Sequence, residues 1–321
     1  MIAACRMCLC VSLSAATGAW AQAWPAKPVR FVMPFPVGGP SDIVGRALGQ
    51  KLGEQLGVNI VPDNRVGAGG GIGVAHAAKS APDGYTWLLT APAIAIIPAL
   101  TPQAAQFDYA RDFAPVARLA AIPNVLLVHP SVPTRTLKDF VALARSQPGK
   151  LNYGSGGAGT TNHLANELLM SLQKIRLVHV PYKGASVAVH ALIGGEVDEV
   201  IVAVAPALPH IRSGRVRPLA VLSESRVASL PEVPTAIEGG VPGFVMVIWY
   251  GLYAPAGTPA DLVARMNREV VRAIGSADLK ARFDAAGVEP WPGTPQEIDA
   301  LTKSETARYA ALIGKAGIRA D

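Results

Sequence analysis

The stretch Pro34-Phe35-Pro36-Val37-Gly38-Gly39-Pro40-Ser41-Asp42 decides the fold, because it joins a short apolar run to an amphipathic helical pattern. Val29 to Met33 before it is typical of a strand, and apolar residues recur at helical spacing from 43 to 56 after it. Glycines let the backbone approach a ligand closely, and we expect Ser41 or Asp42 to cap the helix. Such a helix start binds an anion without a charged side chain, although a capped turn that binds nothing fits the pattern equally well.

A second turn of the same kind runs from Tyr153 to His163, again between a strand and a helix, and reads Tyr-Gly-Ser-Gly-Gly-Ala-Gly-Thr-Thr-Asn-His. The hydroxyl groups of Ser155, Thr160 and Thr161 add donors beside its free N–H groups. Two such turns at the carboxyl ends of two sheets predict one shared ligand site. His163 lies one turn into the helix, where it either contacts the ligand or forms a structural hydrogen bond.

Other ligand classes fit the glycines less well. Gly154 to Gly159 satisfies G-x-G-x-x-G, but a dinucleotide site needs an acidic residue about 20 positions later, and no Asp or Glu lies between Glu167 and Glu196. A third Gly-rich turn, Arg65 to Gly73, lacks the lysine of a phosphate loop. Tyr182 and Lys183 offer an aromatic ring and an ammonium group to a cleft, although an exposed turn lysine explains the latter equally well.

Enzyme and metal signatures are missing. Ser155 is not in a G-x-S-x-G motif, because Tyr153 stands where the first glycine belongs. The histidines show no H-x-x-x-H or H-E-x-x-H spacing that would place two of them on one helix face. We therefore expect no enzyme, no metal and no cofactor. A Ser-dependent enzyme built on Ser155, His163 and Lys183 is the remaining catalytic alternative.

Strand and helix patterns alternate along the chain, which predicts an α/β fold of mostly parallel sheet flanked by helices. With 321 residues, 50% of them hydrophobic, two domains are expected. Two strand-like stretches, Val125 to Val128 and Leu219 to Leu222, are candidate crossings between lobes. They divide the chain into a discontinuous first lobe, 22–124 plus 224–321, and a second lobe, 125–223. Further strands are expected at 58–61, 85–89, 151–153, 177–180, 200–204 and 247–253, and helices at 137–146, 162–172, 186–193, 259–274 and 295–316.

The first residues predict export. Residues 1–21 hold one charge, Arg6, then an uncharged apolar run and Ala19-Trp20-Ala21, which fits a cleaved secretory signal. A lipoprotein signal at Cys5 is the alternative, with little room before it for a basic and an apolar region. All three cysteines lie in this segment, so the mature chain is expected to form no disulfide. The formal charge of +6 is spread thinly, without the basic stripe that nucleic-acid binding needs.

Six ordered segments resemble the tripartite tricarboxylate transporter receptors, the Bug-type extracytoplasmic solute receptors. They are Pro34-Phe35-Pro36 with Gly38-Gly39 and Asp42, Asn64-Arg65 with Gly67 to Gly70, Ala81 to Tyr85, Pro148 to Tyr153, His179 to Gly184, and Trp249-Tyr250-Gly251 with Ala254 to Pro259. The resemblance implies a two-lobed periplasmic binding protein fold of type II-like α/β lobes. It also implies a ligand carboxylate held between the lobes, delivery to membrane permease subunits, and a monomer.

On that pattern, the resemblance implies ligand contacts from the loops after two strands. The candidate ligand-binding residues are Phe35, Val37, Gly38, Gly39, Ser41, Asp42, Gly69, Gly70, Ser155, Gly156, Gly157, Thr160, Thr161, His163, Tyr182, Lys183, Val202 and Trp249. A sensory receptor that presents the same closed form to a signalling partner is the alternative use of such a site.

Two departures from the family pattern bear on the ligand. Family members often carry a polar residue, commonly Asp, where this chain reads Val200 to Val204, and Asn-Pro where it reads Ile97-Pro98. Both changes make the expected distal pocket more apolar. We therefore expect a carboxylate with an apolar or aromatic body rather than an amino-dicarboxylate.

Overall fold

The computed structural model describes residues 24–103 and 105–318. The predicted signal and its cysteines lie outside the described residues. None of the described helices is long and apolar enough to cross a membrane.

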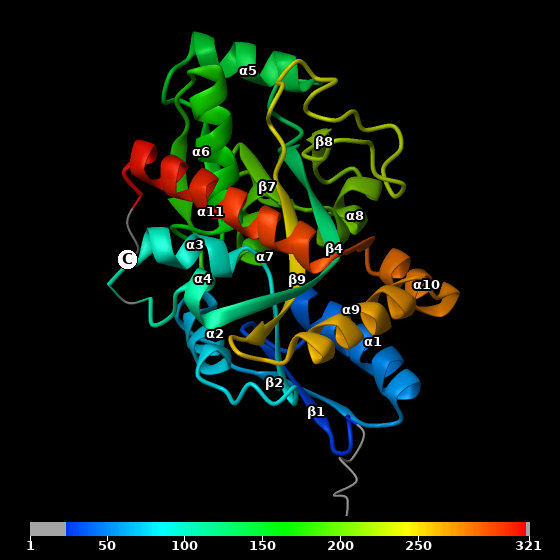
Figure 1. Cartoon of the computed structure of the whole chain (residues 1–321). Helices are drawn as coiled ribbons and strands as arrows, with labels where there is room; N and C mark the ends of the chain where they lie inside the picture. Colours follow the sequence, from blue (N-terminus) through cyan, green and yellow to red (C-terminus); the bar gives the residue numbers. More distant parts are fainter. Residues whose placement is uncertain (1–23, 104, 319–321) are drawn as a thin grey trace, which may run out of the picture.

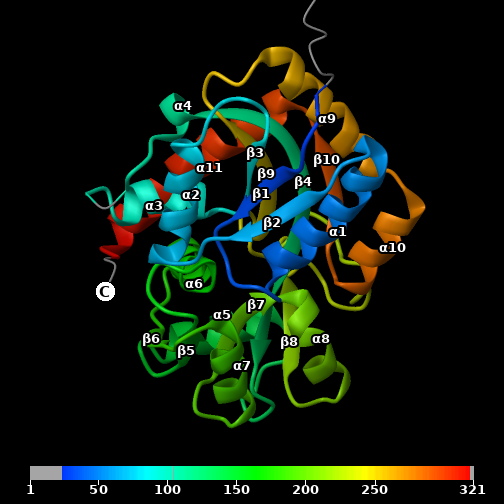
Figure 2. The same ribbon diagram turned by 90° about the horizontal axis from the view of Figure 1, so that it is seen from below.

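The first half of the molecule is built on parallel strands joined by helices. β1 (Val29–Met33) lies between β2 (Ile60–Asn64) and β3 (Thr86–Thr90) and pairs parallel with both. Antiparallel β9 (Val247–Pro255) continues this sheet beside β3. Figure 2 shows the helices on its two faces: α2 (Gly71–Ala78), α3 (Ala93–Leu100) and α11 (Pro295–Ala316) on one, and α1 (Pro40–Leu56), α9 (Ala260–Ile274) and α10 (Ala277–Ala285) on the other.

The second half repeats this arrangement with different strands. β5 (Asn152–Ser155) pairs parallel with β6 (Val178–Pro181) and β7 (Glu199–Ala203). The remaining elements of this half are α5 (Leu137–Ser146), α6 (Thr161–Gln173), α7 (Ala185–Ile193), α8 (Val204–Arg212) and β8 (Arg217–Val221). The predicted strands and helices therefore recur here with bounds shifted by one or two residues.

A single long strand, β4 (Phe113–Val128), joins the two halves (Figure 1). Its residues 113–123 pair with β9, and its residues 124–128 pair with β7 and β8. The short α4 (Tyr109–Asp112) precedes β4, and β10 (Glu289–Gly293) also pairs with it. Every antiparallel pair involves β4 or β9, so the predicted α/β fold is confirmed with a mixed sheet whose parallel pairs lie in its outer strands.

Helix α11 connects the halves a second time. It runs across β4 and contacts α3 of the first half and α6 of the second, as Figure 1 shows in red. One hydrophobic cluster accordingly contains buried residues of both halves, such as Leu88 and Ile97 with Leu164 and Ile201. The core is therefore continuous behind the place where the two Gly-rich turns lie.

Candidate functional site

Helix α3 lies between the two Gly-rich turns. At its start, Ala93 Cβ is 3.4 Å from the position of a Cβ on Gly70, and the Phe35 ring is equally near that position. At its end, Leu100 Cδ2 would lie only 2.2 Å from a Cβ on Gly159, so the leucine fills the space above that glycine. The third Gly-rich turn, on which Phe35 packs, and the turn after β5 thus contact opposite ends of one helix, although they are far apart in the sequence.

The first turn is a tight reverse turn at Pro36 to Gly39. The Gly39 N–H donates to the Pro36 carbonyl over 3.3 Å, and Gly38 at the third position has φ +79°. A positive φ at this position is typical of a type II turn and favours glycine. The sequence therefore requires Gly38 for the turn itself, while Val37 beside it is 68% exposed.

Asp42 organises this turn from within. Its carboxylate accepts hydrogen bonds from Gly38 N at 2.9 Å, Arg46 Nε at 2.8 Å and Asn64 Nδ2 at 3.1 Å. Burial opposes ionisation, but the hydrogen bonds from Arg46, Gly38 and Asn64 outweigh it and hold the pKa of Asp42 below its usual value. Asp42 is thus ionised, and its negative charge is balanced by Arg46. Its hydrogen bond from Gly38 fixes the turn.

Neither Ser41 nor Asp42 caps α1, so that expectation is wrong. The helix begins at Pro40, and Gly39 is its N-cap without a side-chain hydrogen bond. Proline is favoured at the first helical position because its fixed φ suits the helix and its missing N–H is not needed there. The buried Ser41 hydroxyl instead hydrogen bonds to Tyr250 on β9.

The second turn folds around Ser155 and Thr160. The buried Ser155 Oγ accepts from Gly157 N at 3.1 Å, and Thr160 Oγ1 donates to Gly157 O at 2.8 Å. Thr160 is the N-cap of α6, where its hydroxyl accepts from His163 N. These contacts hold the backbone of 155–160 in one conformation over the start of the helix.

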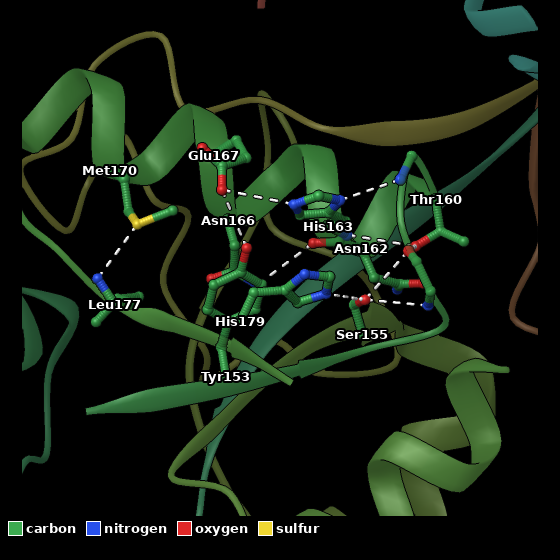
Figure 3. Close-up of polar contacts among 12 residues, drawn as sticks. Tyr153, Ser155, Thr160, Asn162, His163, Asn166, Glu167, Met170, Leu177 and His179 are labelled. Carbon is green, nitrogen blue, oxygen red and sulfur yellow. Dashed lines mark hydrogen bonds and ion pairs between the residues drawn. The ribbon is translucent and has the colours of Figure 1, made fainter. Parts of the chain in front are cut away.

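Two imidazole rings lie beside this turn, as Figure 3 shows. His163 Nδ1 accepts from Gly159 N at 3.0 Å, and His179 Nε2 lies 2.6 Å from Ser155 Oγ. The two rings stack with centroids 4.0 Å apart. His163 therefore has the structural hydrogen bond that was one of its two expected roles.

Both turns leave backbone N–H groups without acceptors. In residues 24–103 and 105–318, the amides with no hydrogen-bond acceptor include Val37 and Ser41 of the first turn and Gly156, Ala158, Thr161 and Asn162 of the second. They lie at the N-termini of α1 and α6, where the helix dipole favours negative charge. This arrangement suits an anion with several acceptor oxygens.

Comparison with known proteins agrees with this geometry. A family model described as "Tripartite tricarboxylate transporter family receptor" matches residues 44–318. The chain belongs to this receptor family. It is also 39% identical over 293 residues to the UPF0065 protein in the tcbD-tcbE intergenic region of Pseudomonas sp. strain P51, covering 91% of this chain and 87% of that protein.

Solved structures show the same fold. R. palustris Rpa4515 with adipate has a TM-score of 0.81 and 34% identity, covering 93% of this chain and 100% of that one. MatC (Rpa3494) from Rhodopseudomonas palustris with bound malate has a TM-score of 0.75 and 32% identity, covering 90% and 100%. The predicted fold is thereby confirmed, and the family match confirms the predicted receptor role.

The receptor's third Gly-rich turn packs against the first. Gly69 and Gly70 both have positive φ, of 63° and 104°. Gly69 is exposed, whereas Gly70 is buried against Pro34 and Phe35. Gly70 thus belongs to the packing beneath Phe35, which is itself half-buried.

Tyr182 and Lys183 lie beside the second turn. The Tyr182 N–H donates to Ser155 O over 2.9 Å, and its hydroxyl reaches Glu196 Oε2 at 3.4 Å. Lys183 is exposed. The loop after β6 therefore borders the turn, with its one ammonium group facing solvent.

Val202 and Trp249 are both buried in the core, at 2% and 1% exposure. Val202 packs in the cluster beneath α7 and α8 with Val125 and Ala188. Trp249 belongs to the cluster shared by the two halves, and its Nε1 has no acceptor among the described residues. A buried indole N–H of this kind is normally satisfied by water or by a ligand oxygen.

Sequence reasoning did not assign His179 or Leu100 to the site. His179 stands in the segment His179 to Gly184 that carries the resemblance, and alternation along β6 places it on the side of the sheet that faces α6. Leu100 lies at the end of an all-apolar helix with no distinctive pattern, so no local signal points to it.

A surface groove of about 620 Å³ lies elsewhere, lined by residues 26–28, the C-terminal half of α1 and residues 57–60. It is away from the α1 N-terminus, and its lining mixes glycine and apolar residues with Lys27, Gln50, Glu54 and Asn59. The unpaired amides and the buried supporting network lie at the two turns instead.

Proposed function

We propose that this protein is a periplasmic receptor that binds a small carboxylate between the turns 34–42 and 154–163 and delivers it to membrane permease subunits. The proposal takes the two halves to be lobes of 22–124 plus 224–321 and of 125–223, working as a monomer after removal of residues 1–21. Closure of the lobes over the ligand would present one defined surface to the permease.

The unpaired amides of the two turns carry the proposal. A carboxylate has about four lone-pair sites, and Val37 and Ser41 of the first turn and Gly156 and Thr161 of the second offer N–H donors without acceptors. Hydrogen bonds between backbone N–H groups and a charged oxygen are about twice as strong as neutral ones. Hydroxyl groups and bridging water complete such a site.

The surroundings favour an acid with an apolar body. The side chains that cover the turns form an apolar wall, since Phe35 lies beside Gly70, Ile97 beside Gly71 and Leu100 beside Gly159. Burying each methylene of a ligand against such a wall gains about 0.8 kcal/mol, whereas burying an unpaired hydroxyl costs free energy. Adipate, which Rpa4515 holds, fits this description better than the hydroxylated malate held by MatC.

The test is isothermal titration calorimetry with hexanoate, benzoate, adipate, malate, aspartate and citrate. We expect the acids with an apolar body to bind at least about tenfold more tightly than malate, as two buried methylenes would provide. Tight binding of citrate or aspartate alone would refute the ligand class, and binding of none of the acids would refute the carboxylate site.

A matched pair of variants then tests the first turn. Val37 is at the second position of the type II turn, where proline is favoured, so Val37→Pro removes the free N–H and keeps the turn. Val37→Ala shortens the side chain but keeps the N–H. We expect Val37→Pro to bind about tenfold more weakly than Val37→Ala, with an equal or higher melting temperature.

A further inference from the structure

Two histidines from different elements hold the second turn in place. His163, in the first turn of α6, accepts the Gly159 N–H at Nδ1, and His179 on β6 contacts the Ser155 hydroxyl through Nε2 (Figure 3). Their partners, Ser155 and Gly159, lie on either side of the unpaired amides of Gly156 and Ala158. The position of those amides therefore depends on both imidazoles.

The hydrogen bond from Gly159 defines the protonation state of His163. A backbone N–H only donates, so the Nδ1 that receives it carries no proton. The ring proton then lies on Nε2, which is 3.5 Å from Glu167 Oε1. A doubly protonated His163 would place two N–H groups against each other at Gly159, so this conformation of the turn excludes it.

Burial and stacking surround the pair with few charges. His163 is 7% exposed, its ring lies 4.0 Å from that of His179, and the Tyr153 ring lies 4.9 Å from His179 and 6.3 Å from His163. Two stacked rings at this distance disfavour a charge on both. Glu167 on α6 is the carboxylate that faces His163 most directly, and it also accepts from Tyr153 Oη at 3.1 Å.

Tyr153, which stacks on His179, and Glu199, which acts on Tyr153, are both neutral. Burial, together with Glu167 and Glu199, raises the pKa of Tyr153, so its phenol keeps its proton. Burial raises the pKa of Glu199 on β7 well above its usual value. Glu167 therefore favours a proton on His163, while the Gly159 amide opposes it, and protonation and the ligand-binding conformation of the turn compete.

We propose that His163 and His179 are positioning residues of the carboxylate site, and that protonation of His163 releases the 155–161 turn and weakens ligand binding. This inference rests on the proposed function. The receptor would hold its carboxylate at neutral pH and release it more readily as the pH falls.

Adipate affinity measured against pH by calorimetry tests the proposal. We expect the wild-type affinity to fall between about pH 8 and about pH 5.5, approaching tenfold per pH unit once the unliganded histidine is protonated. His163→Asn places an amide oxygen near the position of Nδ1, accepts from Gly159 and does not titrate. The His163→Asn variant should bind adipate at pH 8, and its affinity should depend less on pH than that of the wild type. Any titration of adipate itself affects both proteins equally, so it cancels in this comparison.

Two further variants separate positioning from general damage. His163→Leu lacks the acceptor and should bind weakly at every pH, whereas His163→Asn restores binding. His179→Gln keeps a polar partner for Ser155 and should bind more tightly than His179→Ala. The proposal would be overturned if the adipate affinities of wild type and His163→Asn fell equally with falling pH. It would also be overturned if the wild-type affinity did not change with pH.

Nitrogen NMR of the unliganded wild-type protein gives a readout that needs no ligand. At pH 8 we expect His163 Nδ1 unprotonated and Nε2 protonated, with the Gly159 amide resonance shifting as His163 titrates. A proton on Nδ1 at pH 8 would overturn the proposal. Failure of every acid to bind at pH 8 would instead contradict the proposed function, and the NMR result would still decide the role of His163.

Discussion

At the scale of single residues, Glu199 is a buried carboxyl group in the middle of the second half. It is fully buried on β7, and neither of its oxygens has a hydrogen-bond partner among the described residues. Burial raises its pKa well above the usual value, and the nearby Asn166 side chain offsets only part of this. A protonated Glu199 can also donate to the buried Asn166 Oδ1, which otherwise has no donor.

This carboxyl group should make stability depend on pH. The unfolded chain ionises Glu199 near its usual pKa, whereas the folded protein keeps the proton, so stability is lost as the pH rises from about 4.5 through the folded pKa. Glu199→Gln removes that loss. We expect the variant to gain on the order of 1–3 kcal/mol at pH 8 and little at pH 4.5, measured by urea unfolding.

The exposed Glu232→Gln is the matched control and should change stability little at either pH. Equal effects of Glu199→Gln at the two pH values would show that its carboxyl group titrates alike in the folded and unfolded states. That result would contradict the burial argument.

Residue-scale prediction from sequence was wrong for the cap of α1 and right for one of the two expected roles of His163. Gly39 and Pro40 begin α1 without a side-chain cap, whereas His163 in the first turn of α6 accepts the Gly159 N–H. The neutral ring of His163 could not be predicted, because it depends on Gly159, Glu167 and His179 meeting in space. The other candidate contacts stay predictions until a ligand is bound.

At the scale of elements, local signals predicted the bounds of some helices closely. α5 and α11 begin after Thr136 and Thr294, each of which forms a capping box, and the periodic apolar residues behind them fix the helix. Proline obscured other elements, since α3 contains Pro98, α8 contains Pro209 and the first part of β4 contains Pro115. Packing in the core overrides local propensity in these elements.

The start of α6 allows a second backbone test. Thr161 is the first residue of the helix, where proline is favoured, and Thr160 before it has extended φ/ψ that proline tolerates. Thr161→Pro therefore removes one unpaired N–H without breaking a helical hydrogen bond. We expect about tenfold weaker carboxylate binding than for Thr161→Val, which keeps the N–H and loses only the hydroxyl.

Circular dichroism and thermal melts should show both Thr161 variants folded alike. If Thr161→Val weakened binding as much as Thr161→Pro, the hydroxyl rather than the amide would be the ligand contact. Equal, undiminished binding by both would remove α6 from the site.

At the scale of the whole molecule, the two halves meet through contacts between residues distant in sequence. Leu100 covers Gly159, and Ala205 at the start of α8 lies 2.6 Å from the position of a Cβ on Gly287. Helix α11 bridges both halves behind the turns. Sequence periodicity predicted the alternating elements of each half but not these contacts, because they follow from how β4 and β9 align the halves.

The contact of Leu100 with Gly159 should help to hold the two halves in the arrangement that the structure shows. Gly159 has φ +72° and no side chain, and Leu100 of the other half packs directly against it. Leu100→Ala removes this contact while leaving the half-exposed end of α3 folded, and it also removes part of the apolar wall beside the ligand. We expect a larger radius of gyration by small-angle X-ray scattering without ligand, and about tenfold weaker binding of adipate, from roughly 1.4 kcal/mol of lost apolar contact.

Leu172→Ala on the exposed side of α6 is the matched control, since Leu172 is 39% exposed. It removes the same atoms from the second half without touching the junction, so scattering and affinity should stay at wild-type values. If Leu100→Ala scattered like wild type yet bound weakly, Leu100 would act on the ligand alone. If it changed neither quantity, the junction would be held by α11 and β4, because these are the other continuous connections between the halves.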